Sequence, residues 1–217
     1  MQSLRQLTVA IALLAPMRAQ AQEDRPSTAR LVAAGAATAV PTYWIETVIH
    51  EGMHALTAKA FGAEILQFAV IPGRYGPQRH FYFGYVSYRG QLTLGQQTLF
   101  LLAPKLDDLV WLGGYAALVG FGGVPENHYA QVVLAVVATG FWIDFTKDLV
   151  QFWHPADVDV ALSRNGARRF VQRLPWRLLH IGIAAAVAIP LVQGWKSAFA
   201  HPTGSAAFVV PIAGAHF

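Results

Sequence analysis

Four long apolar stretches alternate with more polar connections along the chain. They cover residues 30–61, 97–120, 130–153 and 178–199. Each is close to the ~20 apolar residues that a helix needs to cross a bilayer, and the first is longer. Pro41 lies inside the first stretch, where it predicts either a kink or a later start of the helix. The pattern predicts an all-α membrane protein with about four transmembrane helices.

The connection between the first two stretches, residues 63–96, has a different character. Residues 65–71 and 80–88 form two runs rich in β-branched and aromatic side chains, and both alternate in part. A Pro-Gly pair and a Gly-Pro pair, at residues 72–73 and 76–77, lie between the runs and mark turns. Two strand-like runs around a turn predict a β-hairpin inserted after the first helix.

Composition supports a membrane location. Only 13% of the 217 residues are charged and 54% are hydrophobic, whereas soluble domains carry about 25% charged residues. This balance argues against a disordered chain, a nucleic-acid-binding domain and most soluble enzymes. The chain has no cysteine, which excludes disulfides, iron–sulfur clusters and thiolate zinc sites. Any metal must therefore be held by histidines and carboxylates.

The two ends of the chain are predicted to lie outside the membrane domain. Residues 1–21 have the pattern of a signal peptide, because Arg5 precedes an apolar run and an Ala-Gln-Ala cleavage site. The alternative is a short anchor that is not cleaved. Residues 22–199 then form the integral membrane domain, and residues 200–217 form a C-terminal tail.

Positive charge predicts the orientation of the chain in the membrane. The hairpin insert contains three arginines, and the last connection, residues 154–176, contains four. With four spans these two connections share one side, which the positive-inside rule makes cytoplasmic. The mature N-terminus then lies outside, in what we expect to be a bacterial inner (plasma) membrane.

His50-Glu51-Gly52-Met53-His54 forms an HExxH motif within the first apolar stretch. Residues i and i+4 share one face of a helix, so both imidazoles can reach one ion, and Glu51 can act as general base toward a bound water. Zn²⁺ is the expected cofactor because imidazole and carboxylate ligands suit it. The alternative is a structural role, in which the motif is a polar helix face whose groups hydrogen-bond to neighbouring helices.

Three aspartates are candidates for the third metal ligand. Asp144 comes first, because a rise of about 1.5 Å per residue puts it at the same depth as the two histidines. Asp148, one turn further along, comes second, and Asp157, at the rim of the membrane, comes third. The alternative for Asp144 is an ion pair with Lys147.

Two further acidic residues are candidates for positions behind the ligands. Glu46 lies one helical turn before His50 and could orient it. Asp107 belongs to a cluster with Lys105 and Asp108 in the second apolar stretch. That cluster is either an i,i+3 ion pair that neutralises itself or part of the lining of the site.

With these residues in view, the chain resembles the site-2 protease family of intramembrane zinc metalloproteases. The segment from Ile49 to Gly62 is similar to that family's HExxH helix, and a hairpin insert follows it. Ala103-Pro104-Lys105-Leu106-Asp107 is similar to the family's Gly-Pro-x-x-Asn element. The chain departs from the family in one respect: it contains no Asp-Gly, whereas the family's third ligand lies in an Asn-Pro-x-x-Asp-Gly motif.

The resemblance implies zinc bound by His50, His54 and an Asp, with Glu51 as general base. It also implies that the substrates are membrane-embedded proteins or peptides, which are cleaved within the lipid bilayer. The competing hypothesis is a non-proteolytic membrane protein on the same scaffold that binds metal or a membrane partner, and the missing Asp-Gly favours it. The absence of an inverted repeat argues against a transporter.

Overall fold

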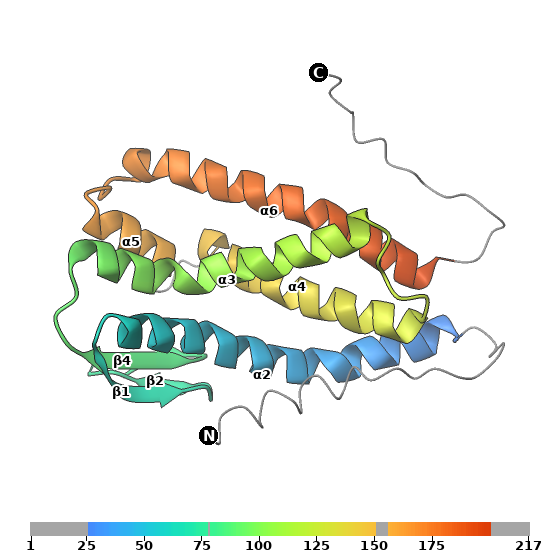
Figure 1. The fold of residues 1–217 in the computed structure, drawn as a ribbon, viewed down its shortest axis with the longest axis horizontal. Helices are drawn as coiled ribbons and strands as arrows, with labels where there is room; N and C mark the ends of the chain where they lie inside the picture. Colours follow the sequence, from blue (N-terminus) through green and yellow to red (C-terminus); the bar gives the residue numbers. More distant parts are fainter. Residues whose placement is uncertain (1–25, 78, 151–155, 201–217) are drawn as a thin grey trace.

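The computed structural model describes residues 26–77, 79–150 and 156–200. In this part of the chain, four long helices run back and forth as a bundle (Figure 1). A short fifth helix and two small pairs of antiparallel strands lie at one end of it. The predicted signal peptide and nearly all of the predicted tail lie outside the described residues.

Helix α2 spans Thr28–Ala60 and carries the HExxH motif in its last three turns. Ser27 caps the start of the helix, because its side chain accepts a hydrogen bond from a first-turn amide at 3.4 Å. Pro41 lies inside the helix without ending it. After the last turn, Gly62 has a φ of 79°, a left-handed conformation that closes a helix and that glycine adopts without strain.

The predicted hairpin is confirmed as antiparallel strands, which form two successive pairs. Strand β1 (Glu64–Ala69) pairs with β4 (Tyr85–Arg89), and β2 (Gly73–Tyr75) pairs with β3 (His80–Tyr82) further out. The register of the first pair shifts near the start of β1, as at a β-bulge. The strands pack beside the end of α2, so the hairpin lies close to the HExxH motif (Figure 1).

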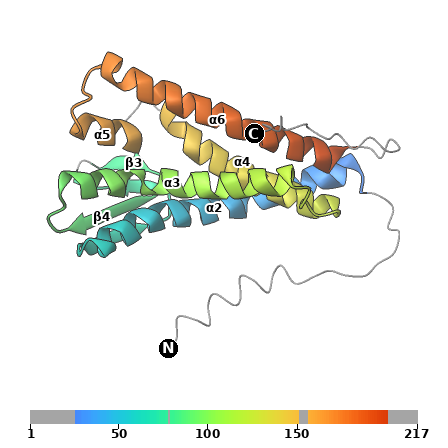
Figure 2. The same ribbon diagram turned by 45° about the horizontal axis from the view of Figure 1, so that its top comes forward.

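The remaining helices complete the bundle. Helix α3 (Leu94–Gly120) starts at the hairpin end and runs back along α2, and α4 (His128–Val150) returns between α2 and α6 (Figures 1 and 2). The short α5 (Asp157–Arg164) lies at the hairpin end, where α6 (Phe170–Phe199) also begins. The hairpin and the connection from α4 to α6 therefore share one end of the bundle, as the sequence predicts.

The last connection differs from the expectation. Residues 154–176 contain α5 and the first turns of α6, which starts at Phe170 and not near residue 178. Helix α5 has two acidic residues in its first turn and Arg164 in its last turn, which complement the helix dipole. The helix is only eight residues long, too short for its hydrophobic pattern to stand out.

The bundle buries small and polar side chains and exposes large apolar ones. Nine alanines and nine polar or charged residues are buried in the described part of the chain, whereas Val110 and Val171 are 72% and 75% exposed. Among the described residues, α4 and α6 are long and apolar enough to cross a membrane by length and composition. Helix α3 is as long, but it carries Lys105, Asp107 and Asp108 close together.

Candidate metal centre

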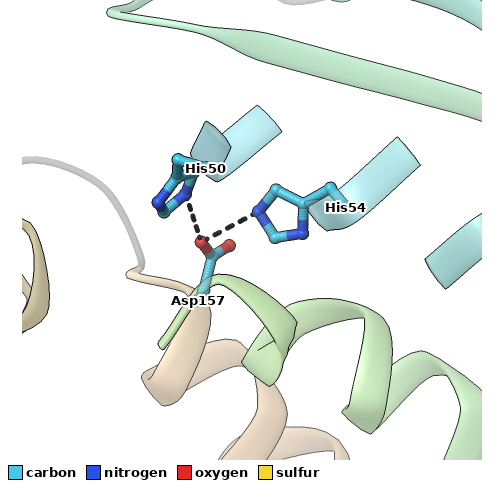
Figure 3. Close-up of side chains that lie close together, drawn as sticks. All are labelled: His50, His54 and Asp157. Carbon is cyan, nitrogen blue, oxygen red and sulfur yellow. Dashed lines mark ion pairs between the residues drawn. The ribbon is translucent and has the colours of Figure 1, made fainter. Parts of the chain in front are cut away.

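Three side chains converge at the hairpin end of the bundle. His50 and His54 lie one turn apart on α2, and Asp157, the first residue of α5, reaches both of them (Figure 3). The Oδ2 atom of Asp157 lies 3.5 Å from Nε2 of His50 and 3.3 Å from Nε2 of His54. One possible ligand atom from each residue lies within 4.8 Å of the others. This group could hold a metal ion.

Both histidines are buried, and each ring is held from behind through its Nδ1 atom. Nδ1 of His50 lies 2.8 Å from Oδ2 of Asp144, and Nδ1 of His54 lies 2.7 Å from the carbonyl oxygen of Phe100. An imidazole that donates its Nδ1 hydrogen keeps a lone pair on Nε2, which is the form that binds a metal. Metal-binding histidines commonly have such partners. The two contacts therefore prepare both Nε2 atoms to bind a metal on the side of Asp157.

The start of α5 fixes the position of Asp157. Ala156 precedes it and provides no side-chain cap for the helix. Instead, Oδ2 of Asp148 on α4 accepts a hydrogen bond from the amide of Val158 at 3.3 Å. Burial alone would raise the pKa of Asp157, but hydrogen bonds that the two histidines donate when their Nε2 atoms are protonated outweigh burial and hold that pKa well below the usual value. Asp157 is therefore a carboxylate at neutral pH, the form that a metal binds.

Buried charges form a network behind the histidines. Nζ of Lys105 lies 3.1 Å from Oδ2 of Asp144, and it also donates to the backbone carbonyl of that residue. The same Nζ lies 3.6 Å from Asp108 and 3.7 Å from Asp148. Nζ of Lys147 lies 2.5 Å from the other carboxylate oxygen of Asp144. Lys105, Asp108 and Asp148 are each only 4% exposed, so their attraction is weakly screened by water.

Glu51 lies beside His50 on the wall of a cavity of about 830 Å³. Helices α2 and α4 and residues 82–86 of the hairpin supply most of its lining, together with Asp157. Gly84 approaches Glu51 so closely that a Cβ atom on the glycine would lie 2.6 Å from Cγ of Glu51. A larger residue at position 84 would therefore displace the side chain of Glu51.

The structure changes the order of preference among the three candidate aspartates. Asp157, ranked third, shares a possible ligand group with the two histidines, whereas Asp144, ranked first, contacts the opposite ring nitrogen of His50. Asp148 binds the start of α5. The depth argument placed Asp144 level with His50, and the two residues do meet there. The depth of a residue in the membrane could not specify which nitrogen of the imidazole ring would meet the carboxylate.

Glu46 and Asp107, the two other acidic candidates, differ in whether they line the cavity. Glu46 lines the cavity, and its carboxylate packs against Gly140 of α4, where a Cβ atom would overlap with it. Asp107 is not among the described residues that line the cavity. The predicted pair of Lys105 with Asp108 is present, but it belongs to the larger network and is not an isolated i,i+3 pair.

Sequence reasoning missed two parts of the site. The carbonyl of Phe100 holds His54, and a backbone carbonyl leaves no trace in a sequence because every residue has one. Lys105 connects Asp108, Asp144 and Asp148, although the sequence suggested only its nearest neighbour. Its position within an apolar stretch was the signal, since a buried lysine requires carboxylate partners.

Comparison with known proteins identifies no relative. No protein-family model, no curated protein and no solved structure matches this chain. The resemblance to the site-2 protease family therefore depends on the sequence motifs alone.

The residues present fit a divalent cation. Two imidazoles and one carboxylate are a common ligand set for catalytic zinc, which leaves a further position for water. More carboxyl groups than ammonium groups also lie at the site. The carboxyl groups are those of Glu46, Glu51, Asp108, Asp144, Asp148 and Asp157, and the ammonium groups are those of Lys105 and Lys147.

Proposed function

We propose that this chain is an intramembrane zinc metalloprotease that hydrolyses peptide bonds of membrane-embedded substrates. The observation that carries the proposal is the convergence of His50, His54 and Asp157 beside Glu51, on the wall of a cavity large enough for a substrate. His50, Glu51 and His54 belong to the HExxH motif, and Asp157 supplies a carboxylate from a separate helix. Zinc hydrolases use this arrangement.

The distribution of polarity supports a membrane location. Large apolar side chains are half or more exposed on several helices, whereas His50, Glu51, Lys105 and Asp148 are buried. A soluble protein rarely combines this many buried charged residues with so many exposed large apolar side chains. In a bilayer, ionisable groups face the interior of the bundle and mark functional sites. Four spans, with the hairpin and α5 on the cytoplasmic side, would place the site near that surface.

Zinc is the metal that the ligand set favours. It would be held by Nε2 of His50, Nε2 of His54 and the carboxylate of Asp157. Bound there, it would supply Lewis acidity toward the scissile carbonyl and a water of lowered pKa. Asp144 and the carbonyl of Phe100 would keep both imidazoles in the tautomer that presents Nε2.

Glu51 is the proposed general base. Its carboxylate would accept a proton from the attacking water and then donate it to the nitrogen of the departing amine. The side chain is buried against Gly84, which restricts its carboxylate to the neighbourhood of the two histidines. Burial also keeps bulk water away from the charge that forms there.

The hairpin is the proposed docking element for the substrate. Helical peptide bonds are shielded by their own hydrogen bonds, so a substrate helix must unwind before it can be cut. Strand β4 begins at the cavity, because Tyr85 and Val86 contribute to its lining. In the described residues β4 pairs with β1 alone, so an extended substrate segment can be added along its other edge.

The general base provides the test of the proposal. The wild type, Glu51→Gln and Glu126→Gln would be reconstituted with zinc beside a panel of single-span transmembrane peptides, and new N-termini would be identified by mass spectrometry. Glu126 is an exposed glutamate at the other end of the bundle, so it serves as the matched control. We expect Glu51→Gln to keep about one zinc per chain and to lose 10²–10⁴-fold in cleavage rate, whereas Glu126→Gln cleaves normally. Unchanged cleavage by Glu51→Gln would contradict the proposal.

The second candidate is a membrane protein that binds the metal without hydrolysing peptides. The missing Asp-Gly favours it, since the carboxylate ligand then comes from the short helix α5 in an unfamiliar sequence context. The same experiment separates the two candidates. Zinc binding that requires His54, together with no cleavage of any peptide by the wild type, would favour this second candidate.

A further inference from the structure

Lys105 lies at the branch point of two chains of contacts that end at the metal ligands. The first chain passes from Nζ of Lys105 to Oδ2 of Asp144 at 3.1 Å, and from that same oxygen to Nδ1 of His50 at 2.8 Å. It therefore ends at the ring that presents one of the ligand atoms. A contact between Nζ and the backbone carbonyl of Asp144 holds the lysine against α4 at this point.

The second chain leads to the carboxylate ligand. Nζ of Lys105 lies 3.7 Å from Oδ1 of Asp148, and Oδ2 of Asp148 accepts a hydrogen bond from the amide of Val158 at 3.3 Å. Val158 follows Asp157 directly, and Ala156 gives α5 no side-chain cap of its own. The position of Asp148 therefore determines where the first turn of α5 begins and where Asp157 lies.

We propose that Lys105 is a positioning residue for the metal centre, acting through Asp144 on His50 and through Asp148 on Asp157. The inference rests on the proposed metal site and adds to it a residue that touches none of the three ligands. Helix α3 would thereby join α2 and α5, the two elements that carry the ligands. Neither of the two chains of contacts includes Asp108, the third carboxylate partner of Lys105.

The direction in which zinc affinity changes when Lys105 is replaced distinguishes a positioning role from a purely electrostatic one. A fixed ammonium group close to a cation site repels the cation, so its removal should tighten metal binding if Lys105 acts only through its charge. Removal of a positioning residue should weaken binding, because the ligands lose their arrangement before the metal arrives. Loss of a residue behind the ligands typically costs about 10–100-fold in metal affinity.

The experiment measures the zinc affinity of the full-length protein in detergent by competition with a chromophoric chelator. Lys105→Met removes the ammonium group while keeping most of the side-chain length. Lys59→Met is the control, because Lys59 is an exposed lysine near the end of the same helix as the histidines. We expect Lys105→Met to bind zinc about 10–100-fold more weakly than the wild type, and Lys59→Met to bind it equally well.

Two further measurements test whether the loss comes from an unpaired buried charge or from a changed arrangement of the ligands. Lys105→Met combined with Asp108→Asn removes one charge of each sign, which keeps the formal charge of the buried region unchanged, and we expect it to show the same weakened binding. The d–d absorption spectrum of bound Co²⁺ reports the ligand arrangement, and we expect its bands to change in both variants but not in Lys59→Met.

The outcomes separate this inference from the proposed function. Zinc affinity in both Lys105 variants that equals or exceeds that of the wild type, with an unchanged Co²⁺ spectrum, would overturn the positioning role and leave the metal site intact. Absence of zinc binding in the wild type would overturn the metal site and the inference with it. Weakened binding in both variants, with altered Co²⁺ bands, would support it.

Discussion

The two ends of the helix bundle are built from the same helices but packed in opposite ways. At the end where α2 begins and α6 finishes, Leu31, Val132 and Ala198 form an apolar cluster, and each is at most 2% exposed. At the hairpin end, helices of the same bundle bury Lys105, Asp108 and Asp148, together with Glu51 and the two histidines of the HExxH motif. The apolar end is held by close packing and by hydrogen bonds between uncharged groups, such as Ser197 with Gln131, whereas every buried charge at the other end needs a partner.

This difference supports the proposed location of the functional site. Buried charges are costly, and hydrophobic residues of similar volume are often at least as stabilising. The apolar end shows that these helices can pack without charges. Stability therefore does not explain the charged end, and the convergence of three possible ligands there does.

Substitution of matched histidines should give the largest contrast between the two ends. His54→Ala removes a proposed ligand and should abolish zinc binding. His128→Ala removes a histidine at the apolar end, where its Nδ1 lies 2.9 Å from the carbonyl of Ala198, and zinc content should remain about one per chain. Metal analysis by mass spectrometry of both detergent-purified variants checks this. Equal zinc content in the two variants would disprove the location of the site.

A smaller contrast is expected within the charged end itself. Asp157→Asn weakens a proposed ligand, and Asp144→Asn changes only a residue behind His50, so the first should lose far more zinc affinity than the second. For Asp144→Asn we expect a loss of about 10–100-fold. Chelator competition measures both, and a larger loss in Asp144→Asn would return Asp144 to the position of third ligand.

A substitution at the apolar end should lower the stability of the folded protein and leave its metal affinity unchanged. Leu31→Ala leaves a cavity between α2, α4 and α6, and substitutions of this kind cost about 2–5 kcal/mol. Zinc affinity of the folded protein should be unchanged, because Leu31 lies in the first turn of α2 and the histidines lie within its last three turns. Unfolding in detergent, followed beside chelator competition, tests both parts. A matching loss of zinc affinity would show that the two ends are not independent.

The smallest effect is expected at the surface of the charged end. Thr93 and Gln96 form a capping box at the start of α3, and Thr93→Ala should cost about 1 kcal/mol. Because this cap is exposed and touches no member of the site, zinc affinity should again be unchanged. Any loss of zinc affinity in Thr93→Ala would mean that the site depends on the whole end of the bundle and not on the buried network.

The sequence predicts the local features of this molecule better than its long-range ones. Four long helices, the hairpin and the shared face of His50 and His54 follow from patterns within a few residues, and the structure has them. The extent of α6 and the presence of α5 were missed, because a short amphipathic helix gives little periodic signal. The number of membrane spans stays a prediction.

The third ligand could not be chosen from the sequence for a physical reason. Depth along a helix placed Asp144 beside His50, and they meet at 2.8 Å. A histidine offers two nitrogens on opposite sides of its ring, and only tertiary structure determines which one faces a given carboxylate. Asp157 reaches the histidines because α5 folds back against the bundle, a change of direction that no local pattern specifies.

The central claim is that His50, His54 and Asp157 together bind one zinc ion. Zinc K-edge X-ray absorption on the detergent-purified protein tests it most directly, with the wild type compared with Asp157→Asn. The account predicts two imidazole nitrogens and oxygen ligands at about 2.0–2.2 Å in the wild type, and a changed oxygen shell in the variant. Zinc surrounded by oxygen alone, or an identical spectrum in Asp157→Asn, would contradict it.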